Sequence, residues 1–246
     1  MNRTLAALFA TMALMAGCST GPVTESPAAA SPSVASAPTP APSTQPTTPS
    51  SSPTSEPSAG LVTHALAPFG PDGFDDQDPR AASITFTFDA PASWERFEEI
   101  GVWIDGNGPP EGADLMFFRG MGLYGEPCLT DEAASPDIAV GPTVDDFVTA
   151  LVDHPSIDVT APVDVTLAGY PGQYLDLQVP DDIGACATYK PLDGHHYAQG
   201  PGQRWHMWVL DVGGVRVLVE TNDFAGTSAQ RLGEVQAMID SLQIEP

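Results

Sequence analysis

The sequence predicts an α+β fold in which a largely antiparallel sheet is covered by helices. Short apolar or alternating segments, which are typical of strands, lie on both sides of one helical segment. A Gly213-Gly214 pair separates two of these segments and is a strong hairpin signal. An apolar stripe with helical spacing lies near the end of the chain. Strands joined by short turns, with helices set apart from them, are the pattern of an α+β domain.

The predicted strands are segments in which apolar residues alternate with polar ones or form a short run between turn residues. We expect Tyr170-Pro171-Gly172 to form a turn between two of these strands. The predicted strands span residues 84–88, 101–104, 115–118, 157–167, 174–179, 205–210 and 215–219.

The first predicted helix begins after Thr143. Asp146 follows this N-cap three positions later, which favours a capping arrangement. Phe147 and Leu151 then recur at helical spacing, and Pro155 requires the helix to end before it. We therefore expect a short helix in the middle of the chain.

The second predicted helix lies near the C-terminus. Thr227 and Gln230 form a capping-box pattern at its start. Its apolar stripe predicts a face that packs on the sheet, and the stripe consists of Leu232, Val235, Met238, Ile239 and Leu242.

The N-terminus has the pattern of a secretory signal. Arg3 is the only basic residue before an apolar run at residues 5–16, and small residues then lead to Cys18. The run is too short for a membrane-spanning helix, which needs about 20 apolar residues. The segment therefore predicts export of the chain.

Residues Leu14-Met15-Ala16-Gly17-Cys18 resemble the lipobox of bacterial lipoproteins. Met15 stands where the family usually has leucine. In that family the cysteine receives a diacylglyceryl group and the signal is cut before it. The resemblance implies that residues 1–17 are a signal peptide and that Cys18 carries lipid. It also implies a lipid-anchored protein on the extracytoplasmic face of the cell membrane. The alternative is an ordinary secretory signal with an incidental cysteine.

The three cysteines are consistent with one disulfide. If Cys18 carries lipid, Cys128 and Cys186 remain as an even pair in an exported domain, where oxidation is permitted. We therefore predict a Cys128–Cys186 disulfide. The competing interpretations are two free thiols or a metal pair, but the sequence has no CxxC spacing that would favour zinc.

Residues 18–60 differ sharply in composition from the rest of the chain. Pro, Ser, Thr and Ala dominate, and Glu25 and Glu56 are the only charged residues. This composition predicts a disordered, partly extended tether, and such a tract can also be O-glycosylated. No second linker follows, so residues 61–246 are expected to form one globular domain.

The charge of the domain is strongly one-sided. The chain has 8 Lys and Arg residues against 32 Asp and Glu residues, for a net charge of −24. Nucleic-acid binding is improbable, because phosphate contacts are made largely by Lys and Arg. Binding of the domain itself to anionic lipid is equally disfavoured. Solubility or a high-salt habitat explains the acidity without a specific cationic partner.

The order of several turns and core segments resembles uncharacterised domains of actinobacterial exported lipoproteins. It runs from residues 88–95 through the central helix and Tyr170-Pro171-Gly172 to the Gly213-Gly214 hairpin and the closing helix. More distantly, the pattern is similar to the PsbP-like α/β/α sandwich. The resemblance covers most of residues 80–246 and implies a fold, but it supplies no set of catalytic residues.

The best metal-ligand candidates are His195, His196 and His206, with Asp193 nearby. Adjacent histidines on an extended segment point to opposite sides, so loop polarity is the simpler explanation of the pair. We expect no metal and no cofactor. A second acidic group is interpreted as a solvated loop because its spacing does not match a calcium loop, and it comprises Asp72, Asp75, Asp76 and Asp78.

Residues 61–246 contain no G-x-S-x-G nucleophile motif. Aromatic residues are expected to pack in the core, although some of them could line an apolar pocket: Trp103, Phe117, Phe118, Tyr124, Trp205 and Trp208. The favoured hypothesis is a non-enzymatic, membrane-anchored module that binds an unknown envelope protein or small ligand. The alternative is an envelope hydrolase that uses Asp, Glu or His side chains. A concave site with converging carboxylates or histidines would favour the hydrolase.

Overall fold

The computed structural model describes residues 60–69, 80–119, 122–131, 134–194 and 196–246. Of these residues, 42% lie in strands and 16% in helices, and the described part contains only two α-helices. All strand pairs within it are antiparallel. The fold is therefore β-rich. The predicted helix-covered sheet, with its PsbP-like α/β/α sandwich, is wrong.

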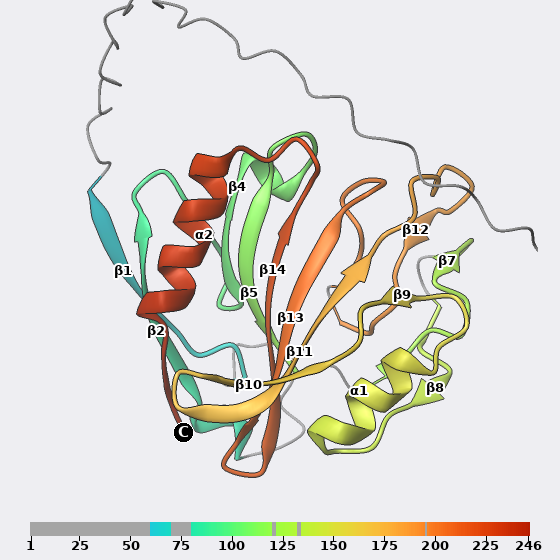
Figure 1. The fold of residues 1–246 in the computed structure, drawn as a ribbon, viewed down its shortest axis with the longest axis horizontal. Helices are drawn as coiled ribbons and strands as arrows, with labels where there is room; N and C mark the ends of the chain where they lie inside the picture. Colours follow the sequence, from blue (N-terminus) through green and yellow to red (C-terminus); the bar gives the residue numbers. More distant parts are fainter. Residues whose placement is uncertain (1–59, 70–79, 120–121, 132–133, 195) are drawn as a thin grey trace, which may run out of the picture. The chain divides into compact units, whose positions relative to one another are not determined.

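A central eight-stranded sheet organises the fold (Figure 1). Its longest strands, β11, β13 and β14, lie side by side, and the Gly213-Gly214 turn joins the last two, as predicted. Both glycines have positive φ, which suits a tight hairpin turn. In spatial order the sheet runs β10 (Val163–Leu167), β11 (Tyr170–Gln178), β13 (Arg204–Val212), β14 (Val215–Asp223), β5 (Ala113–Phe118), β4 (Gly101–Ile104) and β3 (Glu95–Phe97), and β9 (Asp158–Val159) also pairs with β11.

Three smaller sheets surround the central one. A three-stranded sheet contains β1 (Leu61–Leu66), β2 (Thr85–Pro91) and β15 (Gln243–Glu245). Two-stranded sheets pair β7 (Cys128–Leu129) with β12 (Thr188–Tyr189), and β6 (Gly122–Leu123) with β8 (Ile138–Ala139). Single 3₁₀ turns occur at Ala81–Ser83 and Asp105–Asn107.

The two α-helices pack at different places on this framework. Helix α1 (Val144–Val152) contacts β9, β11 and β13, whereas α2 (Ala229–Ser241) contacts β2 and β5 (Figure 1). Thr143 caps α1 through a reciprocal capping box with Asp146, as the sequence suggested. Helix α2 begins one residue later than predicted, because Ser228 is its N-cap.

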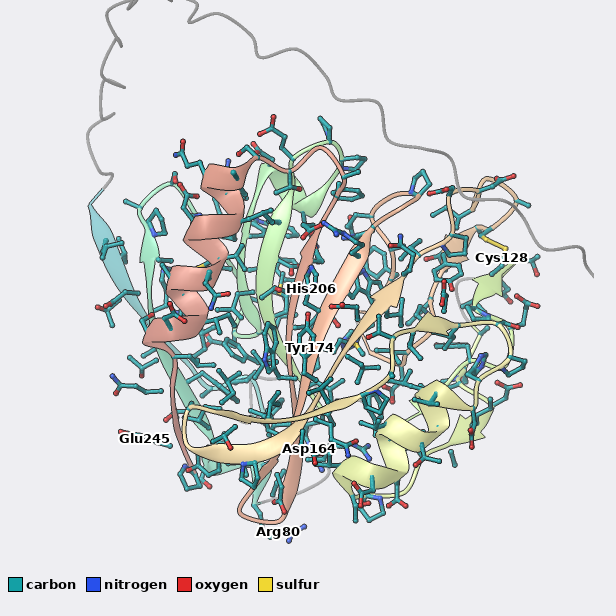
Figure 2. The ribbon with its side chains drawn as sticks, in the orientation of Figure 1. Arg80, Cys128, Asp164, Tyr174, His206 and Glu245 are labelled. Carbon is teal, nitrogen blue, oxygen red and sulfur yellow. A yellow bond between two sulfur atoms is a disulfide. The ribbon has the colours of Figure 1, made fainter. Side chains whose placement is uncertain are left out.

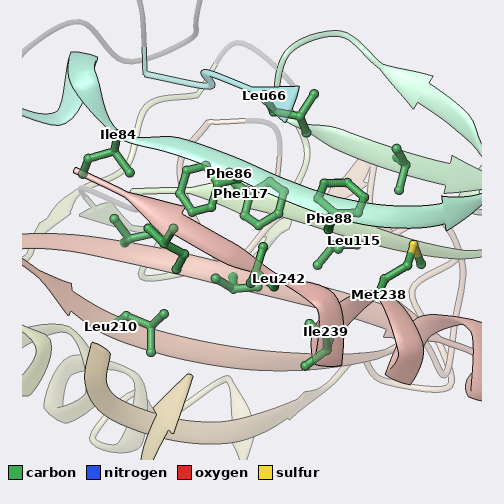
Figure 3. Close-up of a cluster of buried hydrophobic side chains, with 14 of the residues drawn as sticks. Leu66, Ile84, Phe86, Phe88, Leu115, Phe117, Leu210, Met238, Ile239 and Leu242 are labelled. Atoms are coloured by element: carbon green, nitrogen blue, oxygen red, sulfur yellow. The ribbon is translucent and has the colours of Figure 1, made fainter. Parts of the chain in front are cut away.

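Alternation along the strands gives the central sheet two buried faces. One face packs against α2 and the three-stranded sheet, and Phe86 stacks on Phe117 there with ring centroids 4.2 Å apart (Figure 3). The other face packs against α1 and the short strands, with Phe147, Leu151 and Trp205 in its core. Strand β13 serves both cores because Trp205 and Leu210 point to opposite faces.

The fold-class prediction failed because short strands and loops cover much of the central sheet. Strands β6, β7, β8 and β12 have two residues each, which is too short to show an alternation pattern. Two local expectations also need correction. Tyr170-Pro171-Gly172 lies within β11, and the turn falls at Ala168 and Gly169, which have positive φ. The expected strand at residues 157–167 is divided into β9 and β10.

Candidate functional site

The strand register gathers polar residues at one end of the α1 face. Asp114 on β5 lies directly opposite Asn222 on β14, and Asn222 lies opposite Trp205 on β13. Glu220 points to the same face because it stands two residues before Asn222. His196, from the segment after β12, completes this group of buried residues. We call the site formed by these five residues the acidic recess.

The acidic recess encloses a cavity of about 30 Å³. A water molecule needs roughly 10–15 Å³ measured in this way, so the cavity matches a very small ligand or two waters. Tyr197 is the exposed member of the lining, with 44% of its surface accessible, so the mouth lies beside it. The other lining residues outside the five are Phe97, Ile100, Trp103, Asn107, Met116, Phe118 and Gln199.

Asp114 is the most deeply buried acid of the recess, with only 1% of its surface exposed. Its Oδ2 accepts hydrogen bonds from the amides of Asn222 and Asn107, the latter at 2.5 Å. Burial, followed by the charge of Glu220, raises the pKa of Asp114 well above its ordinary value, although the two amides oppose this shift. A cation placed beside Asp114 would oppose this shift and favour the carboxylate form.

His196 and Glu220 form a close pair in the recess. Nε2 of His196 lies 3.2 Å from Oε2 of Glu220, although the two groups are not aligned as a hydrogen bond. Nδ1 of His196 lies 3.1 Å from the carbonyl oxygen of Asp193, which can only accept, so Nδ1 carries a hydrogen. In a neutral ring the lone pair of Nε2 then faces the carboxylate of Glu220.

Several polar atoms of the recess have no hydrogen-bond partner among the residues that the structure describes. They are Oδ1 of Asp114, Oδ1 of Asn222, Nε1 of Trp205, and Nε2 of His196 with Oε2 of Glu220, which face each other without a hydrogen bond. Leaving a buried polar atom without a partner costs about 1–3 kcal/mol. A ligand that supplies several donors and at least one acceptor would form hydrogen bonds with these atoms.

A second polar network lies on the opposite face of the sheet, where Figure 2 labels Tyr174 and His206. Nδ1 of His206 lies 2.6 Å from Oδ1 of Asp176, and Nε2 lies 3.0 Å from Oδ2 of Asp223. The Tyr174 hydroxyl lies 2.5 Å from the same oxygen of Asp176, and Arg204 binds Asp223 at 2.6 Å. We call these five residues the His206 network.

The His206 network is suited to holding a charged imidazolium. Burial alone would lower the pKa of His206, but hydrogen bonds and charge interactions with Asp223 and Asp176 raise it above its ordinary value. Because both ring nitrogens face carboxylates, neither is free to act as a general base. The arrangement indicates an electrostatic clamp between β11, β13 and β14.

The metal-ligand candidates from the sequence do not converge. His196 lies in the acidic recess beside Trp205, so His206, the next residue on β13, points to the other face. No group of three or more His, Cys, Asp or Glu side chains suited to a metal occurs within the described ranges. His195 lies outside these ranges, as does the acidic segment containing Asp72, Asp75, Asp76 and Asp78.

The predicted Cys128–Cys186 disulfide is confirmed, with Cα atoms 4.9 Å apart (Figure 2 labels Cys128). Cys18, the signal peptide at residues 1–17 and the tether as far as residue 59 lie outside the described residues. No helix in the described ranges is long and apolar enough to cross a membrane.

The aromatic residues divide between the two faces. Trp103, Phe118 and Trp205 line the acidic recess, whereas Phe117 lies in the opposite core. Sequence reasoning missed Asp114 and Glu220 as a pair. Each of these acids adjoins a strongly apolar run in the sequence, which is a sign that it is buried. Their proximity to each other depends on the pairing of β5 with β14, which the sequence does not show.

Comparison of the chain with protein-family models and with curated proteins finds no match. The geometry of the acidic recess and the N-terminal motif therefore carry the functional argument.

Proposed function

We propose that this protein is an extracytoplasmic lipoprotein that binds a small envelope ligand without transforming it. The apolar run and the lipobox resemblance ending at Cys18 support export and lipid anchoring. The Cys128–Cys186 disulfide is in keeping with this location, because disulfides persist in oxidising compartments. The tether at residues 18–60 would then let the acidic domain stand away from an anionic membrane surface.

The binding role is carried by one observation, the buried polar atoms that converge on the acidic recess without partners among the described residues. A ligand that forms hydrogen bonds with these atoms would remove the free-energy cost of burying them without partners. The recess is also flanked by aromatic side chains, which is typical of small-ligand sites.

The anchoring part is tested by mass spectrometry of the mature protein and by phase partitioning in detergent. The expected result is a mature chain that begins at lipidated Cys18 and enters the detergent phase. The Cys18→Ala variant should remain in the aqueous phase while keeping its Cys128–Cys186 disulfide. An unmodified Cys18 in the wild-type protein would reject the lipoprotein assignment.

A hydrolase is the second candidate, because Asp114, Glu220 and His196 converge in a concave site. A carboxyl group with a raised pKa beside a close His–Glu pair is an arrangement used in general acid–base catalysis. The small cavity argues against it, since about 30 Å³ cannot enclose a sugar ring or a peptide unit.

The two candidates are separated by incubating the purified mature protein with cell-wall glycan and peptide substrates. Binding without product formation is expected. Turnover that is lost in Glu220→Gln but retained in Glu245→Gln would establish the hydrolase. Glu245 is a suitable control because it lies exposed on β15, within another sheet.

A further inference from the structure

The unpartnered oxygens of the acidic recess define the chemistry of its ligand. Oδ1 of Asp114 and Oδ1 of Asn222 have no partner among the described residues, and Oε2 of Glu220 faces only Nε2 of His196, at 3.2 Å; all of these residues line one cavity. All four residues are at least nine-tenths buried. A primary ammonium group carries three N–H donors and no acceptor, so it can donate to Asp114, Asn222 and Glu220 together.

The charge of the recess favours a cation. Two of its residues are acids, and none of its described lining residues is Lys or Arg. The surrounding chain is also strongly acidic, so its field concentrates cations at the protein surface. Phe97 and Trp103, whose rings stack 4.2 Å apart, add aromatic surface that attracts cations through its quadrupole.

An organic ammonium fits the recess better than a metal ion. Calcium takes six to eight oxygen ligands, and magnesium requires an octahedron, whereas the orphan oxygens of the recess are those of Asp114, Asn222 and Glu220, the last of them beside His196. Trp205 also lines the cavity, and its Nε1–H donor has no partner among the described residues. This donor calls for an acceptor atom on the ligand, such as a hydroxyl or carbonyl oxygen beside the amine.

We propose that the acidic recess binds the primary ammonium group of a small amine, held by Asp114, Glu220 and Asn222. The proposal deepens the binding function proposed above and rests on it. Burial and the charge of Glu220 raise the pKa of Asp114, and a bound cation opposes this shift, so binding of the ammonium group favours release of a proton. The titratable groups that line the recess are Asp114 on β5, Glu220 on β14, and His196 and Tyr197 on the segment after β12.

The test titrates the full mature chain with methylammonium, ethanolammonium, tetramethylammonium and potassium chlorides at one ionic strength. The two primary amines should bind saturably and raise Tm by about 3 °C or more when the site is filled. Ethanolammonium should bind more tightly, since its hydroxyl can accept from Trp205. Tetramethylammonium has the same charge but no N–H donor, so it should match potassium. Calorimetry in two buffers of different ionisation enthalpy should show proton release.

The side-chain assignment is tested with a pair of matched variants. Asp114→Asn should weaken methylammonium binding by roughly tenfold or more, as expected for loss of a charged hydrogen bond. Asp164→Asn makes the same charge change on the exposed edge strand β10 and should leave binding unchanged. The indole N–H resonance of Trp205 provides a readout in the unmodified protein and should move with primary amines only.

Equal Tm shifts from all four salts, or a Trp205 resonance that none of them moves, would overturn the proposal. Unchanged methylammonium binding in Asp114→Asn would do the same. A copurified ligand without an amine would overturn this inference while supporting the wider binding function. A lipidated Cys18 in a protein that binds no amine would leave the anchoring proposal intact.

Discussion

His206 is held between two carboxylates, and the stability that this arrangement provides depends on pH. The folded pKa of His206 is raised above its unfolded value, so the folded state binds its proton more tightly. The contribution is therefore complete below about pH 6.5 and is lost as the pH rises through the folded pKa. The partner Asp223 behaves in the opposite sense. Burial opposes the shift, but bonds from His206 and Arg204 lower its pKa, so its contribution is lost as the pH falls through that lowered value.

We predict that His206→Gln lowers the free energy of unfolding by about 2 kcal/mol at pH 6, the scale of hydrogen bonds to charged groups. The cost should shrink as the pH rises through the folded pKa of His206, because the wild-type imidazolium then loses its proton. Denaturant unfolding at pH 6, 7.5 and 9 measures the difference. His64→Gln is the control, since burial and Arg96 lower the pKa of His64, and its cost should not shrink with rising pH. A His206→Gln cost that grows with pH would contradict the clamp.

Residue identity alone could not place the candidate site. His196 and His206 look equivalent in the sequence, yet the position of His206 next to Trp205 on β13 places it on the opposite face from His196. Asp114 and Glu220 are 106 positions apart in the numbering, and they meet only because β5 pairs with β14. Local spacing carries no information about such pairing, so the acidic recess required the fold.

Among the helices and turns, the predictions that the structure confirms are those that depend on interactions between neighbouring residues. The Thr143 cap and the Gly213-Gly214 turn were predicted because capping and positive φ depend on a few neighbouring residues. The turn predicted at Tyr170-Pro171-Gly172 is wrong, because Pro171 and Gly172 both lie within strand β11. Gly172 is required there by close packing, since an added Cβ would lie 2.1 Å from the carbonyl oxygen of Val209.

Helix α1 should depend on its N-terminal cap. The Thr143 hydroxyl accepts from the amide of Asp146 at 3.1 Å, and the Asp146 carboxylate accepts from the amide of Thr143 at 3.0 Å. We predict that Thr143→Ala costs about 1 kcal/mol of unfolding free energy, measured by urea denaturation. Thr149→Ala, on the exposed side of the same helix, should cost nothing or stabilise slightly. Equal costs for the two variants would show that the cap does not contribute.

The disulfide should supply a large part of the stability of the region around β7 and β12. Cys128 lies on β7, and the bond joins residues 58 positions apart. The chain-entropy model gives roughly 4 kcal/mol for closing such a loop. We predict a loss of this size in the Cys128→Ser/Cys186→Ser double variant, measured by denaturant unfolding. The wild-type protein, denatured without reductant, should show no reactive thiol from this pair, and two labelled thiols would refute the bond.

At the scale of the whole molecule, the excess of acidic residues works against compactness. Arg3, Glu25 and Glu56 lie before residue 61, which leaves seven basic residues against 30 acidic residues in residues 61–246. Like charges confined to a folded surface repel one another more than they do in the expanded unfolded chain. The folded state therefore stores electrostatic repulsion, and the local clamp at His206 relieves only part of it.

We predict that salt stabilises this protein. At about 0.01 M salt the Debye length is roughly 30 Å, and near 1 M it is roughly 3 Å, so added salt removes most of the repulsion between surface charges. Tm should rise steadily from 10 mM to 0.5 M sodium chloride in a calorimetric series at pH 7.5. Tetramethylammonium chloride should produce the same rise, because screening depends on ionic strength and not on N–H donors. A flat or falling Tm would mean that attractive pairs such as Arg204–Asp223 outweigh the net repulsion. An additional, saturable rise with methylammonium, above this common baseline, is then the part that belongs to the acidic recess.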